Sequence, residues 1–178
     1  MIDRRTLIGF LCSLPLLGRA KSMDIVILNC IIKRDRLYRV DEERMLFQWV
    51  KEEGSGIYSV GFMQVLSSLV YPLYAIKIKP VNTVVEYDGN LAVVESGKRV
   101  STFPSPLSGK IVEANKVLEK DPSPIVSKPY DSWIVKIRAD RPEELKRLKK
   151  AEDIAEKVKT IIIREKIECL PKVNYNFF

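Results

Sequence analysis

Alternating apolar and polar residues dominate the stretch from Tyr74 to Ile137 and predict a series of short β-strands. In residues 74–79, for example, every second side chain is large and apolar. Further strands are predicted at residues 83–87, 91–96, 99–103, 109–114 and 132–137. Turn-forming residues separate them, as at Asp88-Gly89-Asn90 and Ser96-Gly97-Lys98. Many short strands at even spacing are typical of a small sandwich or barrel.

The segment before Tyr74 predicts a strand, a hairpin and a short helix. Residues 23–32 are apolar and rich in β-branched side chains, which favours an opening strand. Residues 52–56 form a turn signal between a weakly alternating strand at 44–50 and a returning strand at 57–61. Residues 62–69 carry apolar side chains at helical spacing, so we expect one or two helical turns there.

A longer helix is predicted over residues 142–163. Pro142 suits the first helical position, and Glu143 and Glu144 complement the positive end of the helix dipole. Its apolar stripe, spaced by threes and fours, consists of Leu145, Leu148, Ala151, Ala155, Val158 and Ile162. We expect this helix to pack against the β domain.

The first 22 residues differ in character from the rest. Arg4-Arg5 stands before an apolar run at 7–17, as in a twin-arginine export signal, but that run is about half the length of a membrane span. Residues 19–21, Arg-Ala-Lys, make a poor cleavage site. We therefore interpret residues 1–22 as a leader or a mis-assigned extension, and we prefer Met23 as the start.

The composition excludes several kinds of site. The chain of 178 residues contains no histidine, which excludes Ser-His-Asp catalysis and histidine-ligated zinc or haem. Its three cysteines, Cys12, Cys30 and Cys169, form no C-x-x-C motif. We therefore expect neither a disulfide framework nor a thiolate zinc site, and we interpret Cys30 and Cys169 as small core residues in a reducing compartment.

The charges of the chain are spread along it. The formal net charge is +7, and acidic and basic side chains alternate without a basic cluster. Proteins that bind nucleic acids concentrate Lys and Arg on one face, so we expect no nucleic-acid partner. We also expect no membrane association.

The candidate functional residue is Lys98. Two predicted strands meet at Ser96-Gly97-Lys98, which places this lysine at the tip of a hairpin, and we expect Gly97 to adopt a positive φ. No neighbouring acid, base or metal site would make Lys98 a catalyst. An exposed amine on a rigid hairpin is suited to covalent attachment of a prosthetic group, although an ordinary solvated lysine has the same local pattern.

The order of motifs around this hairpin resembles the glycine cleavage system H protein family. Val93 to Lys98, followed by Pro104 to Asn115, resembles the region of that family that carries lipoate. Gln48-Trp49-Val50 is similar to its His-Glu-Trp-Val. Residues 129–137 resemble its Pro-Tyr-Gly-x-Gly-Trp segment, and residues 142–145 match the start of its final helix.

The resemblance implies a mainly β fold, a lipoyl-type barrel-sandwich hybrid of two small antiparallel sheets with short flanking helices and a C-terminal α-helix. Residues 23–140 would form the lipoyl-bearing domain, and residues 141–178 the C-terminal helix and tail. Lipoate would be bound covalently to Lys98, in a turn formed by Glu95, Ser96 and Gly97.

The resemblance also implies a non-catalytic, cytoplasmic carrier. It would take an aminomethyl group from glycine decarboxylase to aminomethyltransferase, dihydrolipoyl dehydrogenase would reoxidise it, and a lipoate ligase or lipoyl transferase would modify it.

The chain departs from the family pattern at several positions. Gly97 and Arg99 flank the lysine where the family has Val and Ala, and Asn82 and Asp88 replace two corner glycines. Both Asn and Asp tolerate left-handed backbone conformations, so the fold should survive. The His-Glu pair before Trp49 is absent, which changes the side of the molecule that faces the lipoyl arm.

Three alternatives remain open. The altered turn favours a diverged lipoate-binding paralogue that carries intermediates of sulfur oxidation with heterodisulfide-reductase-like partners. A biotinyl carrier is disfavoured because biotinyl lysines usually stand between methionines, which Gly97 and Arg99 are not. An unmodified structural module would leave Lys98 unmodified.

Overall fold

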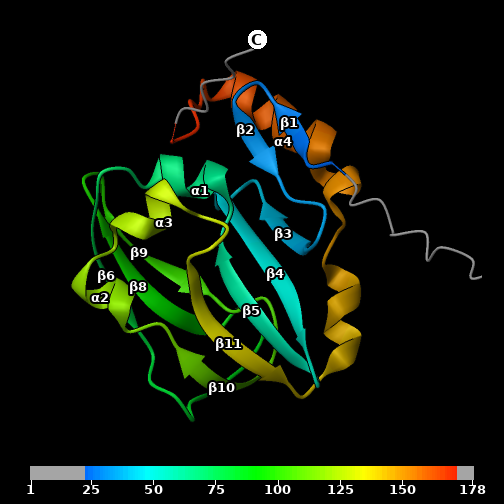
Figure 1. The fold of residues 1–178 in the computed structure, drawn as a ribbon, viewed down its shortest axis with the longest axis vertical. Helices are drawn as coiled ribbons and strands as arrows, with labels where there is room; N and C mark the ends of the chain where they lie inside the picture. Colours follow the sequence, from blue (N-terminus) through cyan, green and yellow to red (C-terminus); the bar gives the residue numbers. More distant parts are fainter. Residues whose placement is uncertain (1–22, 172–178) are drawn as a thin grey trace, which may run out of the picture.

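The computed structural model describes residues 23–171, and most of its strands lie in two antiparallel sheets (Figure 1). The larger sheet has the strand order β3-β4-β5-β11-β10-β7. Its members are β3 (Leu37–Asp41), β4 (Leu46–Gly54), β5 (Ile57–Phe62), β7 (Val84–Val85), β10 (Gly109–Ala114) and β11 (Trp133–Ala139). The smaller sheet, in the order β6-β8-β9, contains β6 (Leu73–Ile78), β8 (Asn90–Ser96) and β9 (Val100–Pro104).

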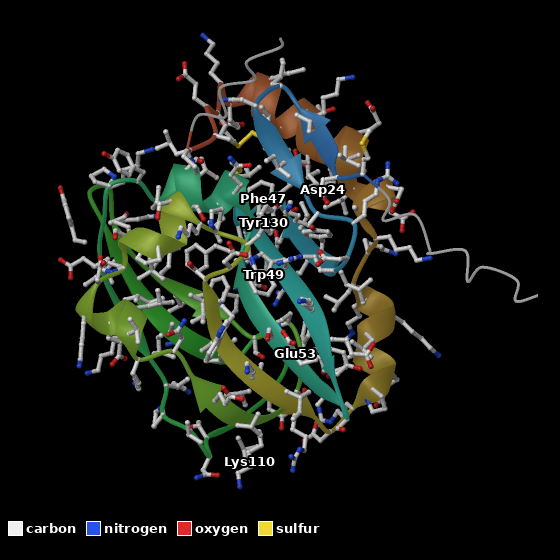
Figure 2. All side chains as sticks on the ribbon, viewed as in Figure 1. Asp24, Phe47, Trp49, Glu53, Lys110 and Tyr130 are labelled. Carbon is white, nitrogen blue, oxygen red and sulfur yellow. A yellow bond between two sulfur atoms is a disulfide. The ribbon has the colours of Figure 1, made fainter. Side chains whose placement is uncertain are left out.

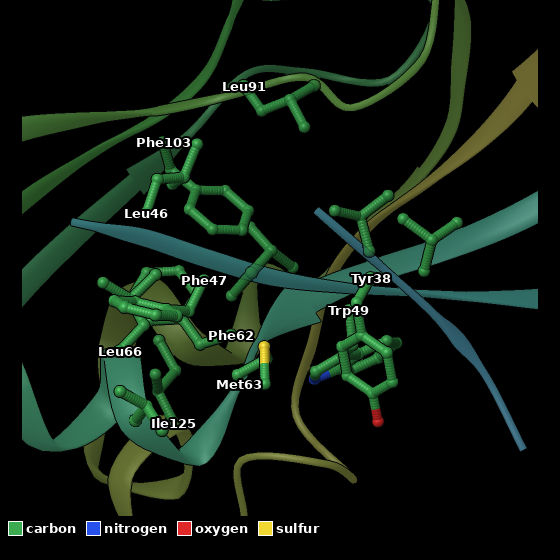
Figure 3. Close-up of a cluster of buried hydrophobic side chains, with 14 of the residues drawn as sticks. Tyr38, Leu46, Phe47, Trp49, Phe62, Met63, Leu66, Leu91, Phe103 and Ile125 are labelled. Atoms are coloured by element: carbon green, nitrogen blue, oxygen red, sulfur yellow. The ribbon is translucent and has the colours of Figure 1, made fainter. Parts of the chain in front are cut away.

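The two sheets enclose one apolar core, because the alternating side chains of each sheet point toward the other. Phe62 at the end of β5 stacks on Phe103 of β9, with ring centroids 4.4 Å apart, so the contact joins the two sheets directly (Figure 3). Leu91 of β8 is fully buried in the same core. The predicted mainly β fold of two small antiparallel sheets is confirmed.

Two sharp corners of the chain are made without glycine. Asn82 has φ 71° and Asp88 has φ 66°, so both residues are in the left-handed region. The backbone N–H of Asn82 donates to the Ile111 carbonyl at 2.8 Å, and that of Asp88 donates to the Ser105 carbonyl at 2.8 Å. The expectation that these two residues substitute for glycine is confirmed.

Three short helices lie beside the sheets. The predicted helix in residues 62–69 is present as α1 (Gln64–Leu69). Two further helices, α2 (Val117–Lys120) and α3 (Ser123–Ser127), were not predicted. Each is so short that its sequence cannot display a helical period.

The predicted continuous helix over residues 142–163 is wrong in its first nine residues. A 3₁₀ helix, η1 (Pro142–Arg147), is followed by a break, and α4 (Ala151–Arg164) begins afterwards. In the break, the backbone N–H and carbonyl of Lys149 pair with the carbonyl and N–H of Tyr38, at 2.9 and 2.8 Å. The backbone of Lys149 is therefore engaged by β3 and cannot continue a helix.

The N-terminal segment forms a hairpin, where the sequence analysis predicts one strand. It also contains a cysteine that the sequence analysis did not expect to be paired. β1 (Ile25–Ile27) and β2 (Cys30–Ile32) pair through a turn at Leu28 and Asn29. Cys30 at the start of β2 forms a disulfide with Cys169, and both cysteines are fully buried (Figure 2).

The expectation that these cysteines are unpaired core residues is therefore wrong. They are 139 positions apart in the sequence, and only the packing of α4 against β1 brings the chain end back beside the hairpin. The disulfide thus joins the two ends of the described chain.

Candidate functional site

Lys98 lies at the tip of the hairpin between β8 and β9, as the sequence predicts, and its side chain is exposed. The strands are in register up to the pair Glu95 and Val100, and the Ser96 N–H donates to the Arg99 carbonyl at 3.0 Å. A short loop closed by this bond leaves the lysine free to project from a rigid support.

The side chain of Ser96 organises the loop. Its hydroxyl donates to the Arg99 carbonyl at 3.0 Å and lies 3.4 and 3.3 Å from the backbone N–H groups of Lys98 and Arg99. This one hydroxyl thereby pairs with backbone N–H and carbonyl groups of the loop, including two N–H groups that the hydrogen bonds between the strands leave unpaired. The predicted contribution of Ser96 to the turn has a clear geometric basis.

Gly97 does not have the positive φ that the sequence analysis predicts for it, and that expectation is wrong. Its backbone N–H donates to the Pro72 carbonyl at 2.8 Å. A Cβ atom built on Gly97 would lie 2.9 Å from Cγ and 3.1 Å from Cδ of Pro72. The glycine is therefore required by the close approach of the loop to Pro72, which begins the segment leading into β6, and not by the turn conformation.

Glu95 is exposed and is not brought toward the loop. Its neighbours Val94 and Ser96 line a cavity on one face of β8, and alternation along the strand directs Glu95 to the other face. No hydrogen bond or ion pair connects Glu95 with Lys98 in the described part of the chain.

A cavity of about 270 Å³ borders Lys98 on the side facing the core. Its floor includes the stacked pair Phe62 and Phe103, and α1 contributes Leu66 and Leu69. The sequence analysis did not predict this cavity. The remaining residues that line it are Arg44, Met45, Leu46, Val70, Val94, Ser96, Arg99, Ser101 and Thr102. Three separate parts of the chain form the cavity, so spacing in the sequence gives no signal for it.

Asp88 accepts hydrogen bonds from Arg39 and from Arg44, and Arg44 lines this cavity. Burial alone would raise the pKa of Asp88, but hydrogen bonds from Arg39 at 2.6 Å and from Arg44 at 2.7 Å lower it below its ordinary value. The carboxylate is therefore charged at neutral pH, and its single negative charge is shared by the guanidinium groups of Arg39 and Arg44.

Trp49 and Tyr130 pack in the core and do not face Lys98. Trp49 is 2% exposed and its indole N–H donates to the Pro129 carbonyl at 3.1 Å (Figure 2). The Arg36 guanidinium lies between the rings of Trp49 and Tyr130, 4.8 and 5.0 Å from their centroids. Burial raises the pKa of Tyr130, so its phenol stays neutral. Phe103 lines the cavity beside Lys98, whereas Trp49, Tyr130 and Trp133 do not.

The described residues include no cluster of three or more Cys, Asp or Glu side chains placed to hold a metal ion. Over residues 23–171 there is also no helix with the length and apolar character needed to cross a membrane.

Comparison with known proteins assigns the family. Residues 37–161 match the Glycine cleavage H-protein family. Glycine cleavage system H protein 1 of Aquifex aeolicus is 57% identical over 135 residues, covering 76% of this chain and 94% of that protein. Glycine cleavage system H protein 5 of the same organism is 35% identical over 79% of this chain and 96% of its own length.

A solved structure agrees with the sequence relatives. The crystal structure of a glycine cleavage system H protein from Mycobacterium marinum superposes with a TM-score of 0.61 at 26% identity. The match covers 71% of this chain and 98% of that one, so nearly all of the neighbour's fold is present here. The chain therefore belongs to the glycine cleavage H-protein family, whose members are non-catalytic carrier subunits.

Proposed function

We propose that Lys98 is the lipoyl attachment site and that the protein acts as a lipoyl carrier. The observation that carries this proposal is the position of Lys98, exposed at the tip of a hairpin whose loop is held by Ser96 and Gly97. The family supports lipoate as the group that is carried.

The residues around Lys98 fit such a group. An exposed primary amine can form an amide with the carboxyl group of lipoate, and the adjacent cavity has apolar walls that suit its hydrocarbon chain. Ser96 and Gly97 fix the direction of the loop and leave the side chain of Lys98 free. Glu95 extends the strand that supports the loop without contacting it.

The function that the family favours is transfer of an aminomethyl group during glycine cleavage, from glycine decarboxylase to aminomethyltransferase, with reoxidation by dihydrolipoyl dehydrogenase. When bound, lipoate supplies the disulfide that accepts the group. The chain itself contributes a rigid support and a tether, which raise the effective concentration of the carried group at each partner. A lipoate ligase or lipoyl transferase must recognise the exposed loop, and we place these events in the cytoplasm.

A second candidate is a carrier for another lipoate-dependent pathway, such as sulfur oxidation with heterodisulfide-reductase-like partners. The observation that favours it is the charge of the cavity beside Lys98, whose lining by the described residues includes arginines and no carboxylate. The same lipoylated lysine would serve both functions.

We further propose that residues 23–140 form the lipoyl-bearing unit and residues 141–178 its C-terminal helix and tail. The leader or extension proposed for residues 1–22 lies outside the described residues.

The attachment site is tested by intact-mass analysis after co-expression with a lipoate ligase and lipoate. We expect one lipoyl adduct in the natural chain and none in Lys98→Arg, which keeps the charge of the exposed loop. The matched control is Lys110→Arg, because Lys110 is an exposed strand residue at the far end of the molecule and should leave the adduct intact (Figure 2). A persistent adduct in Lys98→Arg would refute the assignment.

A further inference from the structure

The cavity beside Lys98 has apolar walls and a positively charged rim. Among residues 23–171, its charged lining residues are Lys98, Arg99 and Arg44, and no Asp or Glu side chain of this range lines it. Lys98 would lose its positive charge on forming an amide with lipoate. The charge that then remains at the rim depends on how the two arginines are paired.

The two arginines differ in this respect. Arg44 donates to Asp88 at 2.7 Å and lies 3.9 Å from Asp41. Because Asp88 also pairs with Arg39 at 2.6 Å, the two carboxylates together balance the two guanidinium groups. Arg99 forms no ion pair with any residue in 23–171. Glu95, the nearest acidic residue in sequence, lies on the opposite face of β8. Arg99 is thus the uncompensated charge at the rim.

We propose that this cavity receives the free end of the lipoyl arm when that end carries an anionic group, and that it disfavours a cationic one. The inference rests on the proposed lipoylation of Lys98. A guanidinium donates paired hydrogen bonds to an oxyanion, and the hydroxyls of Ser101 and Thr102 provide further donors in the same lining. A protonated amine would instead meet Arg99 with no carboxylate to compensate it.

This preference separates the two candidate functions. An aminomethyl adduct ends in an amine, which is cationic when protonated, whereas oxidised sulfur groups and carboxylates end in oxyanions. The cavity therefore selects a cargo ending in an oxyanion and leaves an aminomethyl adduct outside, in solvent.

The test compares adducts of similar size and different charge on the same arm. Lipoylated protein in a Cys12→Ser background is reduced with dihydrolipoyl dehydrogenase and NADH. Its arm thiols are then alkylated with iodoacetate, iodoacetamide or bromoethylamine, and intact mass confirms each product. We expect the carboxymethyl form to melt about 2–4 °C above the aminoethyl form, with the neutral form between them. The methyl NMR signals of Leu66 and Val94 should shift most in the carboxymethyl form.

Arg99→Gln should abolish this order of melting temperatures, whereas the matched control Lys110→Gln should preserve it, because Lys110 is an exposed cation that does not line the cavity. The proposal is overturned if the aminoethyl form is as stable as the carboxymethyl form. It is also overturned if the order survives in Arg99→Gln.

If the proposed function is wrong, the mass spectrum shows no lipoyl adduct on Lys98. In that case the unmodified Lys98→Gln protein is titrated with hexanoate and with hexylamine, and the same methyl signals are followed. We expect hexanoate to bind at least about fivefold more tightly. Equal or weaker binding of hexanoate overturns the inference independently of lipoylation.

Discussion

At the scale of single residues, the identities of Ser96 and Gly97 in the Lys98 loop each follow from one contact. Ser96 supplies a hydroxyl that closes the loop, and Gly97 supplies the space that Pro72 occupies. Lys98 has neither kind of contact and remains exposed. The loop is therefore specified by the residues around the lysine rather than by the lysine itself.

The family residue at position 97, valine, should not be accepted by this loop. We expect Gly97→Val to lower the free energy of unfolding by about 1–3 kcal/mol, because its Cβ would lie 2.9 Å from Cγ of Pro72 and either the loop or Pro72 must move. Urea denaturation measures the loss, and intact mass after lipoylation measures whether the displaced loop is still modified.

The control for this variant is Thr102→Val, an exposed position on β9 of the same hairpin where the change in size is small. It should leave stability nearly unchanged. If Gly97→Val is as stable as the natural chain, the approach of the loop to Pro72 is looser than the structure indicates.

At the scale of elements, contacts between distant segments explain why the predicted C-terminal helix is interrupted and why the chain after α4 lies beside the N-terminal hairpin. Lys149 pairs with Tyr38 of β3, which ends η1 and separates it from α4. The chain after α4 is fixed by the Leu170 N–H, which donates to the Ser68 hydroxyl at 2.8 Å, and by the disulfide of Cys169. Leu170 also lines an apolar groove of about 410 Å³ together with Pro72, the residue that contacts Gly97.

The disulfide should contribute substantially to stability. It closes a loop of 139 positions, for which the chain-entropy relation gives an upper value of about 5 kcal/mol. We expect the double variant Cys30→Ala/Cys169→Ala to lose much of this free energy of unfolding in urea under non-reducing conditions.

The third cysteine provides the control, since Cys12→Ala should leave the unfolding curve unchanged. Thiol titration of the unfolded, unreduced protein should find one free thiol among the three cysteines. Three free thiols would show that the bond between Cys30 and Cys169 does not form.

At the scale of the whole molecule, two small sheets share one core and the termini of the described chain are tied to each other. The hairpin that carries Lys98 belongs to the smaller sheet, and the cavity beside it is closed by the larger sheet and α1. Any loss of packing between the sheets should therefore also change the conformation of the Lys98 loop.

Acid should destabilise the molecule through carboxylates that are paired only in the folded state. Hydrogen bonding from Lys116 lowers the pKa of Glu119, which also accepts the Ile78 N–H at 2.6 Å and so joins α2 to β6. A lowered folded-state pKa contributes stability above the unfolded pKa, and this contribution is lost as the pH falls through the folded value. We expect the free energy of unfolding to decline below about pH 5.

The variant Glu119→Gln should make this decline shallower between about pH 5 and pH 3. Glu43→Gln serves as its control, because Glu43 is exposed and no ion pair is found for it within residues 23–171. If the free energy of unfolding falls in parallel with pH for Glu119→Gln and for the natural chain, Glu119 does not contribute to the acid sensitivity.

The sequence by itself determined those features that are local. Alternation predicted the strands, since a half-buried strand must bury every second side chain. Turn chemistry placed Lys98 at a hairpin tip and allowed Asn82 and Asp88 to occupy left-handed corners. The motifs around Lys98 also indicated the family that the comparisons identify.

Only the tertiary structure decided features that depend on residues far apart in sequence. It paired Cys30 with Cys169, interrupted the C-terminal helix at Lys149, and showed that Pro72 is the reason for Gly97. It also assembled the cavity beside Lys98 and placed Arg99 at its rim, where no acidic side chain of the described chain pairs with it. Each of these features is a contact across a long loop, and such contacts arise from packing, which no local pattern encodes.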